Sequence, residues 1–424
     1  MVLLDAILLM NQFIRRFLPV ALLAGAVIPM SAADAESADD LTEVTEKTSF
    51  LDRWHVLGYV EMAMQRNFDK LGSHHAAPMG DYPAWRLNLP KGCVWAEFDC
   101  GKGWVVGTQV NVVNEGSVPT AGTGSPDDRP MGWGCAVSLD EIWIMKRFGD
   151  AAGLKIGLIG TPVGQQNDCP DSFFGVIRPE DGPEFLAINN QSPSISFEGT
   201  SHGWTYVVMA IPGFVNYDFG NGFWKFGDGI YERTINRLYS GAFWVNNSSI
   251  PGLSLCVSGE FGGGVTSIET GDDTPERRMN TSLALAGFDW AYDDHDILFR
   301  GAYQYGYMGC HEKNNGMTSG LEPIRDMQAM SLGAEIGYDM FSLNRDLVGK
   351  QKFYVFGRYD WSQYQDRDAQ DKAFWNAGHR VTFGVNWYPI DNILVKADVG
   401  FGFKNDPSRI FTGCSIAWLP QWNQ

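Results

Sequence analysis

Apolar and polar side chains alternate along residues 381–403, and this alternation is the clearest structural signal in the chain. A β-strand points successive side chains to opposite faces, so the segment predicts two strands joined near residues 390–391. Their apolar face carries Val381, Phe383, Val385, Trp387, Ile393, Val395, Ala397, Val399, Phe401 and Phe403. Such a face either packs on a second sheet in a sandwich or meets lipid around a barrel whose polar face lines a wet lumen.

The same alternation recurs along most of the chain and predicts about sixteen strands, within a range of fourteen to eighteen. A tilted strand of about ten residues is long enough to cross a membrane, and most of the predicted strands reach that length. They cover residues 54–68, 85–99, 103–115, 134–148, 153–161, 194–200, 203–212, 236–247, 251–263, 279–292, 295–308, 326–340, 350–364, 378–389, 392–405 and 408–418.

The predicted connections alternate between short and long. The short ones are residues 100–102, 149–152, 201–202, 248–250, 293–294 and 390–391, and the long ones are 69–84, 116–133, 162–193, 213–235, 264–278, 309–325 and 365–377. Two connections break this order: residues 341–349 are long where a short turn is expected, and residues 405–407 are short where a long loop is expected. Short periplasmic turns with long extracellular loops are typical of an outer-membrane barrel, whereas a sandwich has no reason to keep the parity. The sequence therefore predicts an all-β, transmembrane, antiparallel up-and-down β-barrel.

The N-terminal segment resembles an export signal. Arg15 and Arg16 precede an apolar run at residues 17–30, and residues 31–35 read SAADA, which fits a cleavage site. The run is shorter than the roughly 20 residues of a spanning helix, although an anchor helix is the alternative. We expect a signal peptide at 1–35, a periplasmic N-terminal tail at 36–53 and the barrel at 54–424.

Composition narrows the class of protein further. Charged residues make up 19% of the chain and aromatic residues 13%, a balance that suits a surface facing lipid. The formal net charge of −18 argues against nucleic acid as a partner. The seven cysteines show no metal-ligand spacing, and most are interpreted as small apolar side chains, with a Cys93–Cys100 disulfide as the alternative. No metal is expected, and passive diffusion through a channel needs no cofactor.

Several short segments together resemble an outer-membrane porin family of the Bacteroidetes, related to the phosphate-selective porin O and P group. They are GYVE at 58–61, RNF at 66–68, FDCGKGW at 98–104, FFGVIRPE at 173–180, FYVFGRYD at 353–360 and TFGVNWYP at 382–389. The resemblance implies a barrel of about sixteen strands, a homotrimer, and passage of small hydrophilic solutes. Phosphate-selective members line the pore with lysine and arginine, whereas this chain is acidic, which weakens the case for phosphate selectivity.

The connection at residues 162–193 is the longest and is the predicted constriction loop. In general porins the equivalent third loop folds into the lumen and narrows it. A lumen position is favoured here over an external lid or an ordinary surface loop, because a long loop in a compact protein is usually functional. Its charged residues are Asp168, Asp171, Arg178, Glu180, Asp181 and Glu184, and Phe173 and Phe174 are candidate wall anchors.

Strand parity predicts which charges face the lumen, since a cation on the lipid face at mid-membrane costs about 2–4 kcal/mol. The expected basic wall is Arg300, Arg358, Arg380, Lys396 and Lys404, and the expected acidic lumen residues are Glu335, Asp339, Asp360 and Asp398. An acidic loop facing a basic wall would create a transverse field that sets ion preference. The alternative is that these charges pair with one another.

Signals for an enzyme are weak. Residues 199–203 read GTSHG, which matches the letters of a nucleophile elbow, but a strand pattern follows where that motif needs a helix. We interpret this segment as a hairpin turn. His74 and His75 lack partners for a metal and are interpreted as a solvated loop tip.

The sequence thus favours a non-enzymatic outer-membrane porin that forms a water-filled channel for passive diffusion of small hydrophilic solutes or ions. Its expected partners are outer-membrane lipid and lipopolysaccharide, the barrel-assembly machinery, small hydrophilic solutes and, in a homotrimer, further copies of itself. One alternative is a solute-specific anion or phosphate channel that uses the arginines and lysines of the basic wall. Others are a plugged barrel acting as an adhesin or structural protein, and an outer-membrane hydrolase with Ser201 as nucleophile.

Overall fold

The computed structural model describes residues 50–67, 86–114, 135–149, 151–163, 170–176, 191–212, 217–218, 233–268, 277–311, 327–367, 373–404 and 410–422. The chain divides into two units, residues 1–49 and 50–424, and the second holds all of these described residues. No helix among them is long and apolar enough to cross a membrane.

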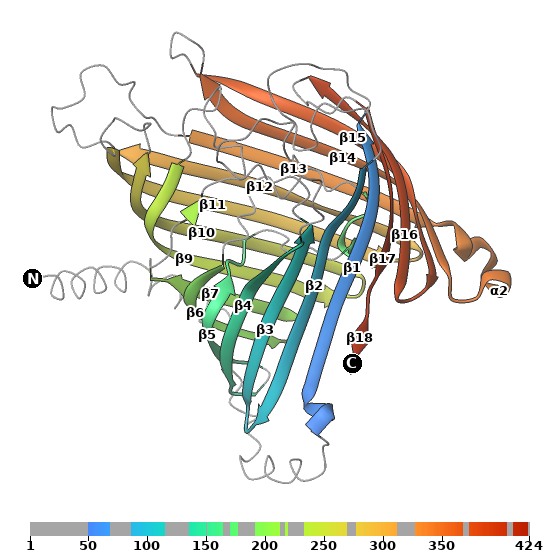
Figure 1. Cartoon of the computed structure of the whole chain (residues 1–424), viewed down its shortest axis with the longest axis horizontal. Coiled ribbons are helices and arrows are strands. Elements are labelled where there is room, and N and C mark those ends of the chain that lie inside the picture. The colour runs from blue at the N-terminus through green and yellow to red at the C-terminus, as the bar shows by residue number, and fades with distance from the viewer. Residues whose placement is uncertain are drawn as a thin grey trace, which may run out of the picture. The chain divides into compact units, whose positions relative to one another are not determined.

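The second unit is built from one continuous antiparallel sheet (Figure 1). The long strands are β1 (Trp54–Asn67), β2 (Arg86–Gly101), β3 (Trp104–Asn114), β4 (Cys135–Arg147), β5 (Gly153–Gly160), β6 (Gln191–Ser201), β7 (Trp204–Ile211), β9 (Arg233–Ile250), β10 (Leu253–Ile268), β11 (Arg277–Asp294), β12 (Ile297–His311), β13 (Met327–Asp339), β14 (Lys352–Arg367), β15 (Ala373–Ile390), β16 (Ile393–Lys404) and β17 (Ile410–Trp418). Two further strands, β8 (Tyr217–Asp218) and β18 (Gln421–Trp422), have two residues each. Short helices are η3 (Phe50–Arg53), η5 (Pro170–Ser172), η7 (Met340–Asn344) and α2 (Arg345–Val348).

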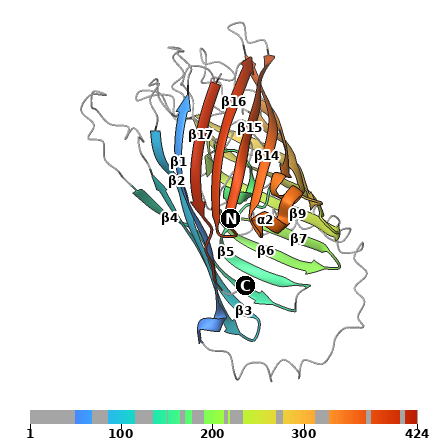
Figure 2. The ribbon, with the colours of Figure 1, turned by 90° about the vertical axis from the view of Figure 1, so that its right-hand side faces the viewer.

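The sheet closes on itself. Each long strand pairs with the next along the chain, and β17 then pairs with β1 from Val60↔Trp418 to Asn67↔Phe411. Figures 1 and 2 show red β17 lying beside blue β1. The predicted closed sixteen-strand up-and-down barrel is therefore confirmed, and every predicted strand overlaps a long observed one. Closure satisfies the backbone hydrogen bonds of the first and last strands and leaves no open edge.

The alternation of apolar and polar side chains in the sequence separates the outer face of the barrel from its inner face. On β1, Val60, Met62 and Met64 point outward and are exposed, whereas Tyr59 and Ala63 point inward and are buried. The outward face is similarly apolar on strand after strand, while the inward face carries charges, hydroxyls and small residues. This is the arrangement expected when the outside meets lipid rather than a second sheet.

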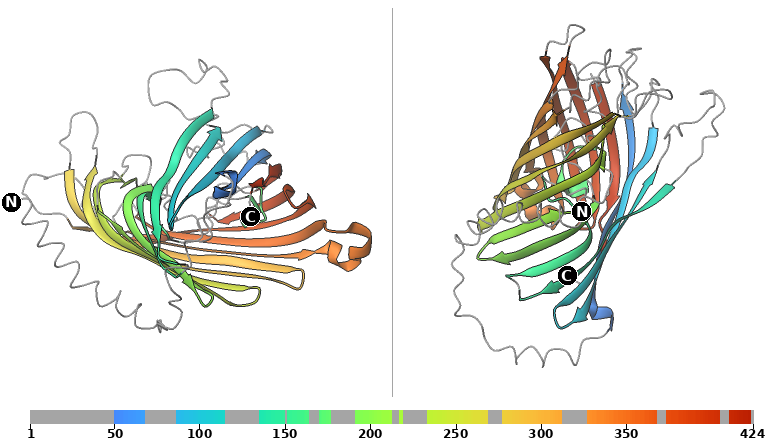
Figure 3. Two further views of the ribbon diagram at one scale, coloured as in Figure 1. Left: turned by 90° about the horizontal axis from the view of Figure 1, so that it is seen from below. Right: turned by 90° about the vertical axis from the view of Figure 1, so that its left-hand side faces the viewer.

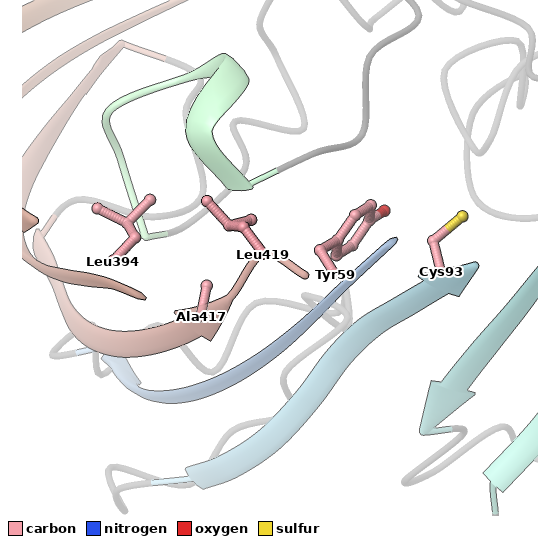
Figure 4. Close-up of a cluster of buried hydrophobic side chains, with 5 residues drawn as sticks. All are labelled: Tyr59, Cys93, Leu394, Ala417 and Leu419. Carbon is pink, nitrogen blue, oxygen red and sulfur yellow. The ribbon is translucent and has the colours of Figure 1, made fainter. Parts of the chain in front are cut away.

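A small cluster of buried side chains closes the seam between the first and last strands (Figure 4). Tyr59 of β1 and Cys93 of β2 gather with Leu394 of β16, and with Ala417 and Leu419 at the end of β17. The Leu419 amide donates to the Asn392 carbonyl at 2.9 Å, which ties the chain end to the β15–β16 turn. The seam is held by apolar packing as well as by strand pairing. Among the described residues, Cys93, Cys100, Cys256 and Cys414 form no disulfide bond.

Tight turns join strands at one end of the barrel (Figure 3). Lys102, His202 and His295 adopt positive φ of 53°, 51° and 51°, the conformation that two-residue hairpin turns require. The segment 199–203 thus lies at a hairpin, as the sequence predicted: residues 199–201 end β6, and His202 and Gly203 form the turn to β7.

The long connection between β13 and β14, which broke the predicted parity, folds into η7 and α2. Arg345 holds it through ion pairs to Asp339 (2.6 Å) and Asp296 (3.1 Å), and Asp339 also accepts from the amides of Phe341 and Phe353. Partial desolvation lowers the pKa of Arg345, but its hydrogen bond to Asp296 and the charges of both aspartates outweigh this and raise the pKa above its ordinary value. The β13–β14 connection is therefore compact although it is long in sequence.

Candidate functional site

The lumen wall formed by β12–β16 carries a dense set of charged side chains. Most alternate with exposed apolar neighbours such as Phe299, Ile336 and Tyr359, so strand geometry places them on the opposite, inward face. Buried there are Arg300, Glu335, Asp339, Asp360, Arg380, Lys396 and Asp398, and the Arg358 side chain is 9% exposed.

Glu335 lies at the centre of this charged set. It is directly opposite Arg300 on β12 and Arg358 on β14 in the strand register. Arg300 Nε donates to one carboxylate oxygen, and Arg358 Nη1 donates to the other at 2.8 Å. Arg358 also bonds Asp360 at 2.8 Å. Cations and carboxylates thus alternate from strand to strand, so that these charges are paired rather than gathered into a basic patch.

A segment of the predicted constriction loop, residues 170–176, lies against this wall. Lys396 Nζ donates to the carbonyls of Phe173 (3.0 Å) and Gly175 (3.1 Å), and Arg300 Nη1 donates to the carbonyl of Asp171 (2.8 Å). The wall cations therefore contact the backbone of the loop. The Asp171 side chain itself is exposed.

Carboxylates of the wall bind the amides of the same segment. The Phe174 amide donates to both oxygens of Glu335 at 3.1 and 3.2 Å, and the Val176 amide donates to Asp398 Oδ2 at 2.7 Å. A buried backbone group that lacks a partner costs free energy, so these bonds are what allow a loop backbone to leave water here. Along the segment, wall side chains donate to the carbonyls of Asp171, Phe173 and Gly175, and they accept from the amides of Phe174 and Val176.

The Phe174 side chain fixes the segment in place. It is 1% exposed, stacks on Phe356 at a ring-centroid distance of 5.0 Å, and lies 5.4 Å from the ring of Tyr354. The Arg300 guanidinium carbon lies over the Phe174 ring, 4.9 Å from its centroid, a cation–π contact. A methyl group built on Gly337 would lie 2.4 Å from Phe174 Cζ, so a glycine is needed at this point of β13.

Val176, like Phe174, packs closely against a glycine of the barrel wall. A methyl group on Gly413 of β17 would lie 2.9 Å from its Cγ1. Because the loop leaves β5 and contacts β12, β13, β14, β16 and β17, it reaches wall strands far from its own origin. The segment therefore lies inside the barrel, as the favoured alternative for the third loop predicted.

Other predicted site residues are placed as follows. Arg380 lies over the ring of Phe411 at 4.9 Å, and Asp339 binds the turn between β13 and β14. Lys404 ends β16, and its side chain lies outside the described residues. Five predicted loop charges lie outside them as well: Asp168, Arg178, Glu180, Asp181 and Glu184.

Sequence reasoning missed three buried lumen carboxylates, Glu61, Glu260 and Asp289. Each alternates with apolar neighbours on its strand, so parity alone would have found them. The contact of Phe174 with Gly337 carries no comparable signal, because the two residues are distant in the sequence and neither type is unusual at its position.

No obvious reaction centre stands out in the described part of the chain. No group of three or more His, Cys, Asp or Glu side chains there is arranged to hold a metal. Ser201 Oγ and His202 Nδ1 lie 2.8 Å apart, but both are exposed on a tight hairpin turn. The polar groups of the lumen wall instead bind the backbone of the loop segment.

The fold is shared with solved outer-membrane proteins. The channel DcaP of Acinetobacter baumannii has a TM-score of 0.56 at 8% identity, covering 87% of this chain and 97% of that one. OmpT of Vibrio cholerae has a TM-score of 0.51 at 12% identity, covering 88% and 99%. OmpF of Salmonella typhi, solved with daunomycin, has a TM-score of 0.50 at 8% identity, covering 87% and 98%. The structure thus defines the fold: a closed antiparallel up-and-down β-barrel, shared with these outer-membrane proteins.

No protein-family model matches the sequence, and no curated protein matches it. The resemblance to the phosphate-selective O and P group therefore stays a prediction, while the barrel fold common to outer-membrane channels is established.

Proposed function

We propose that this protein is an outer-membrane porin that admits small hydrophilic solutes or ions by passive diffusion. The observation that carries the proposal is the loop segment 170–176, docked on the lumen wall of a closed barrel with an apolar outside. A loop that enters the lumen and is held there by the wall narrows a channel without any chemical step. One protein of the same fold, DcaP of A. baumannii, is named as an outer-membrane channel, which supports this function.

A channel selective for phosphate or other anions has less support. Such a channel needs cationic side chains that can bind the passing anion. Arg300 and Lys396 bind loop carbonyls, and Arg358 lies between Glu335 and Asp360. These three cations are engaged by the protein itself.

The proposal includes export by the signal at residues 1–35, insertion into the outer membrane and assembly as a homotrimer. A trimer form is the subject of one solved structure of V. cholerae OmpT, which has a TM-score of 0.51 to this chain. Chemical cross-linking of the detergent-extracted protein would test the assembly. A ladder that ends at the monomer would contradict it.

The direct test of the channel is single-channel recording from the purified protein in a planar lipid bilayer. Discrete conductance steps are the expected result. Correct folding is checked independently by heat-modifiable migration on an SDS gel. A silent bilayer from folded protein would refute the porin and leave the plugged barrel, an adhesin or structural protein, as the better explanation.

A further inference from the structure

The β13–β14 connection, residues 340–351, exposes large apolar side chains at the turn end of the barrel (Figure 1). Leu347 is 81% exposed and Leu343 is 68% exposed, and Met340 precedes them at 42%. Joining two strands does not require leucines in water, since polar residues serve in the β15–β16 turn at Asp391 and Asn392. Neighbouring exposed apolar side chains usually mark a surface that meets a protein or a membrane.

Two hydrogen bonds fix both ends of this connection to outward side chains of the barrel. Ser342 Oγ donates to the Tyr338 hydroxyl of β13 at 3.2 Å, and Trp387 Nε1 of β15 donates to Gln351 Oε1 at 3.2 Å. Tyr338 and Trp387 are both exposed and belong to the outward rows of their strands. The connection therefore reaches the outer side of the barrel wall at both of its ends.

A ring contact supports the same placement. Phe341 stacks on Phe353 of β14 at a ring-centroid distance of 5.4 Å. Phe353 lies two positions before the exposed Val355 and so shares its outward face. The ion pairs that hold the connection engage its arginine and leave Leu343 and Leu347 exposed.

Outward tryptophans mark the level at which this connection begins. Tryptophan is enriched where the hydrocarbon of a membrane gives way to headgroups, and barrels carry aromatic girdles at that level. The exposed tryptophans at the turn end are Trp104 and Trp204, which begin β3 and β7, Trp418, which ends β17, and Trp387 near the end of β15. Because Trp387 binds Gln351, the connection lies next to this girdle.

The charge of the connection differs from that of the whole chain. Residues 340–352 contain three cations, Arg345, Lys350 and Lys352, against one carboxylate, Asp346, in a chain of net charge −18. Lys350 and Lys352 are exposed. Leucines next to exposed lysines suit a segment at a membrane surface, where the apolar side chains enter the acyl boundary and the lysines attract anionic headgroups.

We propose that the β13–β14 connection is an interfacial membrane anchor. Leu343 and Leu347 insert at the boundary between headgroups and acyl chains, and Lys350 and Lys352 lie beside anionic phospholipid headgroups. Lipid is favoured over a protein partner because the exposed leucines continue the apolar outward face of β13 and lie next to the tryptophan girdle. The inference goes beyond the passage of solutes and rests only on insertion of the barrel into a bilayer, which is part of the proposed function.

Photocross-linking of the full-length protein tests the anchor. Benzoylphenylalanine, a photoreactive amino acid, replaces Leu347 in protein reconstituted into vesicles of phosphatidylethanolamine and phosphatidylglycerol. After irradiation, mass spectrometry of the peptide that carries the probe identifies what it has joined. The expected product is a phospholipid adduct, in a yield close to that of the same probe at the outward Phe261 of β10 and several-fold above that at Asp391, in the exposed β15–β16 turn. The probe at Leu343 serves if the Leu347 variant does not show heat-modifiable migration.

A charge variant tests the lysines separately. The adducts at Leu347 should contain a larger share of phosphatidylglycerol than the vesicles do. Lys350→Gln with Lys352→Gln should remove this enrichment, because both exposed cations are lost. The same substitutions should leave the lipid composition of adducts at Phe261 unchanged. An enrichment that persists without the lysines would contradict their role at the headgroups.

The outcomes separate the anchor from the channel. A lipid adduct at Leu347 no more abundant than at Asp391 would overturn the anchor and leave the porin intact. A cross-link from Leu347 to a second copy of the chain in place of lipid would do the same. A barrel that is silent in a planar bilayer but joins lipid at Leu347 would refute the porin and keep the anchor. Loss of the adduct at Phe261 as well would show that the barrel does not lie in the bilayer and would refute both.

Discussion

The substitution Gly337→Ala probes the docked loop segment most directly. Its methyl group would lie 2.4 Å from Phe174 Cζ and 2.7 Å from Phe174 Cε2, whereas carbon atoms in contact normally lie about 3.5–4.0 Å apart. Tyr354, Phe356 and Arg300 contact the ring in its docked position, so a shift of the ring loses these contacts. We expect Gly337→Ala to displace Phe174 from the wall.

The magnitude follows from the cost of overpacking a well-packed site, about 1–3 kcal/mol. At about 1.4 kcal/mol for each factor of ten, the ratio of docked to released loop falls by roughly 5- to 150-fold. Gly357→Ala is the matched control, since its methyl group would meet only Phe383, at an ordinary contact distance of 3.5 Å. Both glycines lie in strand interiors, on β13 and β14.

Single-channel recording distinguishes the two variants. Gly337→Ala should show larger or noisier conductance steps than wild type, and Gly357→Ala should match wild type. Adding Phe174→Leu to Gly337→Ala removes the outer ring atoms that clash and should restore quieter steps. If Gly337→Ala and Gly357→Ala behave alike in folded protein, Phe174 does not hold the loop on the wall and the reasoning fails.

Three further predictions concern the loop, the turn and the lipid face. Lys396→Met leaves two loop carbonyls without their donor, at about 1–3 kcal/mol, and should raise single-channel conductance, whereas Lys352→Met at an exposed position should not. Arg345→Ala removes both ion pairs of the β13–β14 turn and should lower the temperature at which heat-modifiable migration is lost, with conductance unchanged; no such drop, or one equal to that of exposed Lys350→Ala, would contradict the role of the pairs. Phe261→Arg places a cation on the lipid face and should lower the unfolding free energy in urea by about 2–4 kcal/mol, more than Phe261→Leu does; an equal loss for both would mean that this face does not meet lipid.

Local sequence determined the positions of the strands, their number to within two, and the identity of the outward face. A period of two assigns each side chain to a face, and the parity of short and long connections distinguishes a barrel from a sandwich. Residues such as Arg300 and Glu335 could therefore be placed on the lumen face from their neighbours alone. The β13–β14 connection is long in sequence and therefore broke the predicted parity. Its compact fold depends on the ion pairs of Arg345 with Asp296 and Asp339, which sequence spacing does not reveal.

What these inward charges bind was decided only by the tertiary structure. The sequence suggested an acidic loop facing a basic wall, but Lys396 and Arg300 bind loop carbonyls, and Glu335 binds both arginines and a loop amide. Every residue except proline offers the same backbone donor and acceptor, so no residue type marks where these charges bind. Barrel closure and the path of the loop bring residues 170–176 against strands more than a hundred positions away, and that geometry determines which charges bind the loop backbone.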